Sequence, residues 1–199
     1  MRDPFTTRSD PPLPEEYSRI TNPERLRPLH SRAERLLERL QRDYDVTRRE
    51  MFDMLPGMTP FDHDRAPISL VPVAPTAAPI GVAFTALPSL ILRYGRWLAE
   101  PFPVCACDAC AATAEEEWER FEAMVWNVVH GTLTEELSIR MVRAPLLSWS
   151  LGTGSGWSKL PRAHGKALAL RGSGRIRWHP WPERRAAGPT PFAADDGRS

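Results

Sequence analysis

The chain has 199 residues and a formal net charge of +1, with 42% hydrophobic and 26% charged residues. This composition excludes wholesale disorder, and the near-neutral charge excludes a global field that would draw the protein to nucleic acid or to an anionic membrane. The length suits one domain with loose ends. We predict a single α+β domain over residues 21–183, a flexible segment at 1–20 and a disordered tail at 184–199.

The N-terminal residues and the apolar stretches indicate a location. Residues 1–14 carry charges and prolines without an apolar run, so they do not resemble a secretory signal. The longest apolar stretch, residues 80–92, is interrupted by glycine and proline, so no membrane span is expected. We therefore expect a soluble, cytoplasmic protein.

Two helices are predicted in the first third of the chain. In residues 28–44, apolar side chains recur at spacings of three and four and charged side chains occupy the other positions, which is typical of an amphipathic helix. A shorter helix is predicted over residues 47–55. There a Thr-x-x-Glu capping signal comes first, and the Pro56-Gly57 pair would end the helix.

Short strands are predicted next. Residues 68–73, 80–87 and 90–94 are rich in β-branched and aromatic side chains and are separated by prolines. Because strands this short need only tight connections, an antiparallel arrangement is expected.

A third helix is predicted over residues 113–130. Thr113 and Glu116 form a capping box at its start, and His130 followed by Gly131 marks its end. An apolar face runs along it and would pack on the sheet.

The remainder of the chain gives weaker signals. Apolar residues alternate at 137–142 and predict a strand that returns to the sheet. From residue 151 onward regular signals fade, and residues 152–159 are predicted to be a glycine-rich loop, without phosphate-loop spacing and with no helix pattern after it. We thus expect an α+β fold in which a small, mainly antiparallel sheet is packed by the two main amphipathic helices, 28–44 and 113–130.

The feature most able to carry chemistry is a C-x-C-x-x-C motif made by Cys105, Cys107 and Cys110. The two-residue gap between Cys107 and Cys110 lets a tight turn direct two thiolates at one tetrahedral metal, and Cys105 could supply a third. Three soft sulfur ligands favour zinc, whereas a four-cysteine iron–sulfur cluster lacks one ligand. These three cysteines are the candidate metal ligands, and zinc is the candidate cofactor.

The sequence leaves several alternatives open at this motif. The fourth zinc ligand could be His63, His130, Asp108 or water. The same cysteines could form a redox-active thiol site, because the positive end of the helix that begins near Thr113 lowers the pKa of a nearby thiol. They could also be unreactive reduced cysteines, because C-x-x-C pairs occur without metal.

Residues 159–185 carry eight basic side chains and a single acidic one. Together with Trp157, Trp178 and Trp181, this segment could bind single-stranded nucleic acid by stacking bases on the indole rings. In the competing interpretation the tryptophans pack on the sheet and the arginines face water or an acidic helix. We favour packing, since the whole chain is near neutral.

Other motifs give no catalytic assignment. Asp62, His63 and Asp64 are consecutive, and adjacent side chains of an extended chain point apart, so a solvated loop is expected. No Ser/His/Asp set, paired-carboxylate site or nucleotide motif can be assigned. We therefore predict no catalytic residue.

Four segments of the sequence together resemble a known family. They read EYSRITNPER at residues 16–25, YDVTR at 44–48, FPVCACDAC at 102–110 and RWHPWP at 177–182. On these segments the chain resembles an uncharacterised bacterial family, the domain of unknown function numbered six-two-two-six. The resemblance implies one domain over most of the chain and implies no activity.

The chain departs from the pattern of that family at two places in the cysteine segment. Ala106 stands where the family has glycine, which leaves all three sulfurs in place. Ala111 stands where the family tends to have an acidic residue, which weakens the idea of a carboxylate ligand there.

The leading functional hypothesis is a cytosolic accessory or interaction protein with a zinc-supported loop and a protein partner. The competing class is a thiol enzyme or redox sensor that uses the same cysteines. A weak single-stranded nucleic-acid binder is the third alternative, and no membrane partner is expected.

Overall fold

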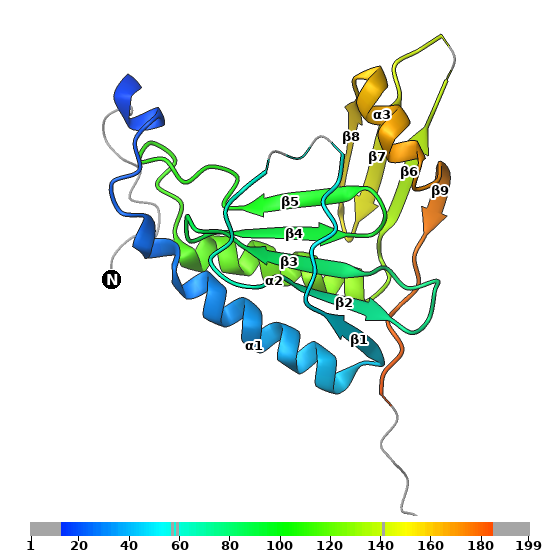
Figure 1. Cartoon of the computed structure of the whole chain (residues 1–199), viewed down its shortest axis with the longest axis horizontal. Coiled ribbons are helices and arrows are strands. Elements are labelled where there is room, and N and C mark those ends of the chain that lie inside the picture. Colours follow the sequence, from blue (N-terminus) through cyan, green and yellow to red (C-terminus); the bar gives the residue numbers. More distant parts are fainter. Residues whose placement is uncertain (1–12, 57, 59, 141, 185–199) are drawn as a thin grey trace, which may run out of the picture.

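The computed structural model describes residues 13–56, 58, 60–140 and 142–184. Within this part of the chain, three α-helices accompany nine strands in two antiparallel sheets, which confirms the predicted α+β fold (Figure 1). The predicted tail at 184–199 lies outside the described residues except for Arg184. The first twelve residues of the predicted N-terminal segment lie outside them as well.

The first sheet is a five-stranded antiparallel meander in chain order. Its strands are β1 (Val46–Arg49), β2 (Ile68–Pro72), β3 (Ile80–Phe84), β4 (Leu90–Tyr94) and β5 (Leu98–Phe102). Strands β2, β3 and β4 lie where β-branched and aromatic residues predict them. Strand β5 was not predicted, because Pro101 and Glu100 interrupt its apolar pattern.

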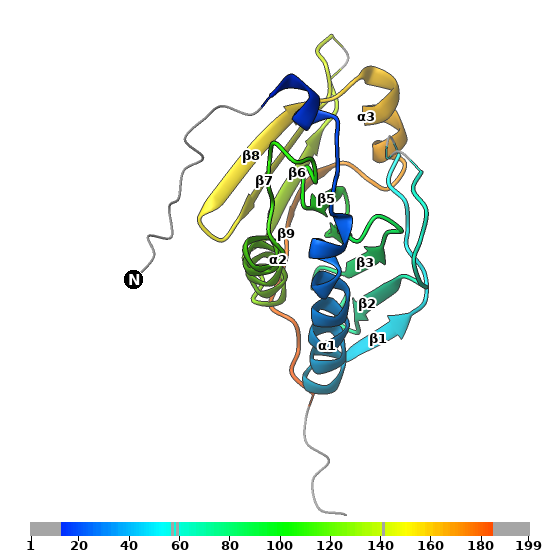
Figure 2. The same cartoon turned by 90° about the vertical axis from the view of Figure 1, so that its left-hand side faces the viewer.

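Two long helices cover one face of this sheet (Figures 1 and 2). They are α1 (Pro28–Asp43) and α2 (Ala114–Val129), and both agree with the sequence prediction. The capping box of α2 is present, because the Glu116 N–H donates to Thr113 Oγ1 at 3.3 Å. Helix α2 contacts α1 on one side and the second sheet on the other. It therefore links the two sheets.

The other face of the first sheet is covered by an irregular segment that follows β1. All five residues of β3 are buried, and the position where Gly81 would carry a Cβ lies 3.6 Å from the Phe52 ring. The Ser69 hydroxyl donates to the Met51 carbonyl at 2.5 Å. Burial on both faces accounts for the near-continuous apolar sequence of β3.

The prediction of a helix at residues 47–55 is wrong. Val46–Arg49 forms the edge strand β1, in which Thr47 pairs with Val71 of β2, and residues 50–56 have no regular structure. The Thr-x-x-Glu capping signal favours a helix only weakly. Val46 and Thr47 are β-branched, and the tertiary fold gives them β2 as a strand partner, which outweighs that signal.

The second sheet has the order β8-β7-β6-β9. Its strands are β6 (Thr134–Ser138), β7 (Leu146–Leu151), β8 (Gly154–Lys159) and β9 (Gly174–Arg177), and helix α3 (Arg162–Ala169) lies between β8 and β9. Two expectations for this part of the chain are wrong. Regular structure does not fade after residue 151, because the glycine-rich stretch forms the turn and second strand of a hairpin, and a short helix does follow it.

The strand predicted at 137–142 forms earlier, at Thr134–Ser138, and it belongs to the second sheet instead of returning to the first. Met141 lies outside the described residues. A buried carboxylate in this strand joins the two sheets. Glu135 of β6 is fully buried and accepts hydrogen bonds from the backbone N–H groups of Arg96 and Trp97, at 2.6 and 3.1 Å, and from Trp178 Nε1 at 2.8 Å. Because these donors come from the β4–β5 turn and from the segment after β9, one side chain connects three parts of the chain.

None of the helices in the described ranges has the length and the apolar character that crossing a bilayer requires.

Candidate metal centre

The three cysteines lie in the loop that connects β5 to α2. Cys107 is buried, with 4% of its surface exposed, while Cys105 and Cys110 are exposed. All three Sγ atoms lie within 4.8 Å of one another, and the Sγ atoms of Cys105 and Cys107 are 3.1 Å apart. The structure therefore brings the predicted ligands together in one cluster that could hold a metal ion.

The local turn directs backbone N–H groups at the sulfur of the central cysteine. The pKa of the Cys107 thiol lies below its ordinary value, because the Cys105 thiol donates a hydrogen bond to it and because the backbone N–H groups of Cys110 and Ala109 also stabilise the thiolate. The turn is closed by the Ala111 N–H, which donates to the Cys107 carbonyl at 3.2 Å. Backbone donors of this kind are what a metal-bound thiolate needs in its surroundings.

The third thiol has the opposite electrostatic situation. The pKa of Cys110 is raised to about 12, because the sulfurs of Cys105 and Cys107 lie beside it and because the group is desolvated. Several thiolates this close repel one another unless a cation lies between them. The cluster therefore favours either one thiolate among thiols or a full set of thiolates around a metal ion.

Asp108, a candidate fourth ligand, has another role. Its carboxylate accepts hydrogen bonds from the Thr21 hydroxyl at 2.5 Å, from the Thr21 N–H at 2.9 Å and from Arg19 Nε at 2.9 Å. These donors lower the pKa of Asp108 to about 2, with the Thr21 hydroxyl making the largest contribution. The side chain anchors the loop to the N-terminal segment.

Further contacts attach the same two segments to each other. Arg25 donates from Nη2 to the Ala106 carbonyl at 2.7 Å and from Nε to the Ala112 carbonyl at 3.2 Å. The Asp108 N–H also donates to the Arg19 carbonyl at 2.8 Å. Sequence analysis missed this attachment, since nothing in residues 16–25 indicates a partner more than 80 positions away. The flexibility proposed for residues 1–20 stays a prediction.

The two histidine candidates lie elsewhere. His130 caps the C-terminal end of α2 and stacks on Trp126, so a helix of 16 residues, about 24 Å long, lies between it and the cysteine loop. His63 bridges to Thr85 beside the end of β3 and contacts Phe61. Among the described residues, no histidine, aspartate or glutamate joins the three sulfurs in a metal-sized group.

The tryptophans of the C-terminal segment are not equally accessible. Trp178 and Trp181 are buried, and their indole N–H groups donate to Glu135 and to the Ala78 carbonyl. Trp157 on β8 is 65% exposed. Two of the three rings proposed for base stacking therefore serve the core, as the packing interpretation predicts.

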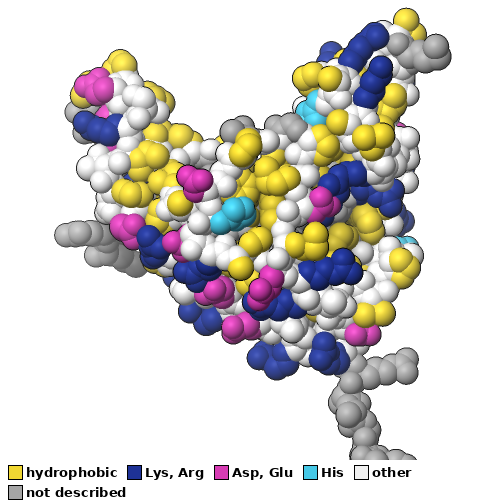
Figure 3. All heavy atoms as spheres, viewed as in Figure 1, with side chains coloured by type: hydrophobic (Ala, Val, Ile, Leu, Met, Phe, Trp, Pro, Cys, Tyr) yellow, Lys and Arg dark blue, Asp and Glu magenta, His cyan; other side chains and the backbone are white. Residues whose placement is uncertain are grey.

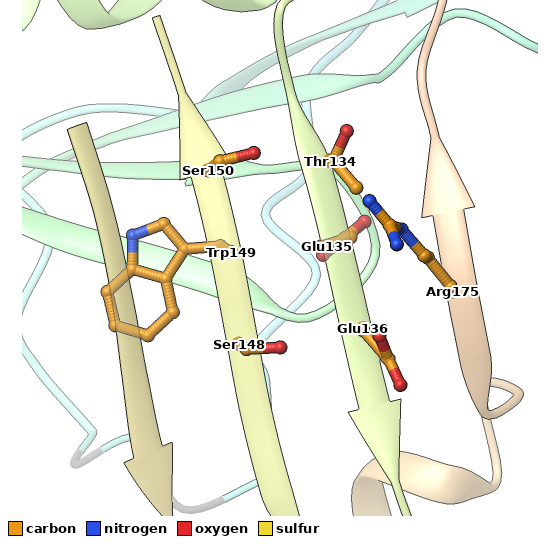
Figure 4. A pocket seen from close by; sticks show the side chains of 7 residues that line it. All are labelled: Thr134, Glu135, Glu136, Ser148, Trp149, Ser150 and Arg175. Carbon is orange, nitrogen blue, oxygen red and sulfur yellow. The ribbon is translucent and has the colours of Figure 1, made fainter. Parts of the chain in front are cut away.

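A shallow polar hollow lies on the second sheet (Figure 4). Thr134, Ser148 and Ser150 contribute hydroxyl groups to it. Glu136 and Arg175 are cross-strand partners there, so their charges offset each other. The hollow has a volume of about 240 Å³, and its lining is more polar than the largely apolar lining of a typical ligand site.

A family model described as "Family of unknown function (DUF6226)" matches residues 2–185. The chain belongs to this family. No curated protein and no solved structure matches the chain. In this DUF6226 protein the four segments that carry the resemblance meet in pairs. Residues 16–25 hold the cysteine loop, and residues 44–48 meet residues 177–182 through the Asp45 N–H, which donates to the Pro182 carbonyl at 2.8 Å.

Proposed function

We propose that this protein binds one zinc ion through Cys105, Cys107 and Cys110 and acts as an accessory protein whose partner docks at the metal loop. The single observation that carries the proposal is the cluster of three unpaired cysteine sulfurs within 4.8 Å. A reducing compartment such as the cytoplasm would keep these thiols available for metal.

The spacing of the sulfurs supports a tetrahedral ion. Two thiolates bound to one zinc at about 2.3 Å lie about 3.8 Å apart. The sulfurs of this cluster lie between 3.1 and 4.8 Å from one another, so each separation differs from the ideal value by about 1 Å or less. Small rotations of the cysteine side chains would complete the geometry without moving the backbone.

A fourth ligand from outside the cluster is expected. The described residues supply only three ligand atoms, and Cys105 and Cys110 are exposed, so the open side of the ion would face solvent. Two exposed apolar side chains belong to the segments that meet here: Val104, next to Cys105, is 68% exposed, and Tyr17, next to Glu16, whose carbonyl accepts from the Ala109 N–H, is 61% exposed. In Figure 3 the projection at the upper left, which carries the β5–α2 loop in Figure 1, shows apolar surface next to acidic and basic side chains. This combination favours a protein partner that covers the apolar rim and either supplies the fourth ligand or shields a bound water.

One observation favours redox chemistry at the same cysteines. The 3.1 Å separation between the Cys105 and Cys107 sulfurs and the lowered pKa of Cys107 suit a thiolate that attacks an oxidant or a disulfide. Against this alternative, Cys107 is buried and would be a poor target for a macromolecular substrate. It is therefore the second candidate function.

The test is to purify the protein without added metal and measure its mass by native mass spectrometry. We expect close to one zinc per chain, and we expect Cys107→Ser or Cys110→Ser to abolish binding because two sulfurs cannot close a tetrahedron. Substitution by Co²⁺ should give thiolate charge-transfer absorption. Added imidazole should shift its ligand-field bands if the fourth position is open to exogenous ligands.

Ala106→Gly is the matched control, because it changes the loop between two cysteines while keeping all three sulfurs. It should retain the metal. Metal-free protein with three freely titrating thiols would contradict the proposal. A single thiol that reacts far faster than free cysteine near neutral pH, in metal-free protein, would support the redox alternative instead.

A further inference from the structure

A second site of a different kind lies at the other end of the first sheet. A cavity of about 340 Å³ is bounded by the loop between β2 and β3, the turn between β4 and β5, and the residues that follow α3. This volume falls at the lower end of the range for small-molecule sites. The cavity shares no residue with the cysteine loop.

The cavity has apolar walls. The β2–β3 loop contributes Pro75, Ala77 and Pro79, and Trp178 forms another wall. The indole N–H of Trp178 already donates to Glu135, so the Trp178 ring presents only an apolar surface to the cavity. Proline-rich walls change little on binding, so the site is largely pre-formed.

Three arginines line the same cavity: Arg93, Arg96 and Arg171. Arg93 comes from β4, and its side chain is 11% exposed. Its Nη2 lies 3.3 Å from Asp53, whereas its buried Nε has no hydrogen-bond partner among the described residues. Arg171 makes a two-pronged pair with the Asp53 carboxylate.

Arg96 is the arginine that no carboxylate engages among the described side-chain contacts. Its Nη1 lies 2.8 Å from the position that a Cβ of Gly172 would take, and its guanidinium carbon lies 5.7 Å from the centroid of the Trp97 ring. A glycine at that position, with φ of +106°, leaves the space that the guanidinium occupies. Basic side chains with an acidic neighbour gather where the ends of β2–β4 meet the second sheet (Figure 3).

The local charges leave a cationic surplus. Two of the three guanidinium groups, those of Arg93 and Arg171, contact Asp53. Glu135 lies close to Arg96, and its oxygens accept hydrogen bonds from two backbone N–H groups and an indole. With both carboxylates ionised the sum is one positive charge. Such an imbalance attracts an anion, and guanidinium groups bind oxyanions with two parallel hydrogen bonds.

We infer that this cavity binds a small organic carboxylate, with the carboxylate on Arg96 and Arg93 and the apolar part against Trp178 and the prolines. The surplus of one charge matches a carboxylate better than a phosphate dianion. This inference is independent of the proposed metal site, because the two sites use different residues.

Benzoate is the probe, benzamide is its uncharged counterpart of the same shape, and phenyl phosphate is the dianionic alternative. Isothermal titration with the full-length protein at low salt should show saturable binding of benzoate. Benzamide should bind at least about tenfold more weakly, because it lacks the charge-assisted hydrogen bonds. Tighter binding of phenyl phosphate than of benzoate would overturn the assignment to carboxylates.

Two variants should have opposite effects on benzoate affinity. Arg96→Gln should weaken it at least about tenfold, since one charged donor pair is lost. Asp53→Asn should strengthen it several-fold, because it releases Arg171 and Arg93 from a competing carboxylate. Arg175→Gln, on the exposed face of the second sheet, is the control and should leave binding unchanged. No benzoate binding, or equal affinity in wild type and Arg96→Gln, would overturn the inference.

Discussion

Ala111 closes the cysteine turn with a φ of +50°, the left-handed region that side chains with a Cβ rarely adopt. The residue is exposed, so no packing contact compensates for the strain. Its N–H is nevertheless fixed by the Cys107 carbonyl, which holds the chain in this conformation. The strain is therefore the cost of directing the chain from the cysteine turn into α2.

Ala111→Gly is expected to stabilise the protein by about 0.5–1 kcal/mol, because glycine adopts this conformation without steric cost. The midpoint of thermal unfolding should rise by about 2 °C for a chain of this size. Ala112→Gly is the control at a position without positive φ, and it should destabilise through the added flexibility of the unfolded chain. An unchanged or lower midpoint in Ala111→Gly would show that the turn relaxes in solution.

At the scale of elements, the cysteine loop and the N-terminal segment form one unit. Asp108 accepts three hydrogen bonds from Thr21 and Arg19, and Arg25 donates to carbonyl groups on both sides of the motif. These contacts join residues more than 80 positions apart. The rigidity of the candidate metal loop therefore depends on a segment that contributes no ligand.

Asp108→Asn should lower the urea midpoint at neutral pH, because the charge-assisted hydrogen bonds to Arg19 and Thr21 are weakened. The pKa of Asp108 in the folded state is about 2, below its unfolded value, so its contribution is present above about pH 4 and is lost as pH falls toward 2. The difference in midpoint between wild type and variant should thus shrink over that range. Asp62→Asn, on an exposed loop, is the control. A difference that does not change with pH would contradict the anchoring role.

At the scale of the whole molecule, the two sheets are held together by α2 and by Glu135. The carboxylate of Glu135 is buried, and burial raises its pKa even though three donors partly stabilise the anion. Gly95 is required beside it, since a Cβ at that residue would lie 2.6 Å from Glu135 Oε1. The junction between the sheets is consequently polar at its centre.

Glu135→Ala should destabilise the protein by about 3 kcal/mol or more, because it leaves three buried donors without an acceptor. Glu135→Gln should cost less, since one oxygen acceptor remains. Glu136→Ala, whose side chain lies on the opposite face of β6, is the matched control and should change stability little. Urea denaturation measures all three. Equal effects of Glu135→Ala and Glu136→Ala would show that the carboxylate does not join the sheets.

Much of the first half of the fold could be predicted because its signals are local. The apolar stripes of α1 and α2, the Thr113 capping box and the prolines between β2, β3 and β4 all act within a few residues. Of the second sheet, only a strand near β6 was predicted. Strand β8 is almost entirely exposed and rich in glycine and serine, so its order comes from pairing with β7 and not from an apolar pattern.

For the candidate site, the sequence by itself determined the candidate ligands, because three cysteines within six positions can reach one ion in most loop conformations. It left the fourth ligand open among His63, His130, Asp108 and water, and only the tertiary structure could show that none of these three side chains joins the sulfurs. The fold places His130 at the far end of α2, His63 beside β3, and Asp108 in a clamp with Thr21 and Arg19. The arginine cavity was likewise decided by the tertiary structure, since Arg93, Arg96 and Arg171 meet only when β4 and the end of α3 come together. Spacing along the chain fixes contacts within a turn, whereas contacts between distant segments depend on how the sheets and helices pack.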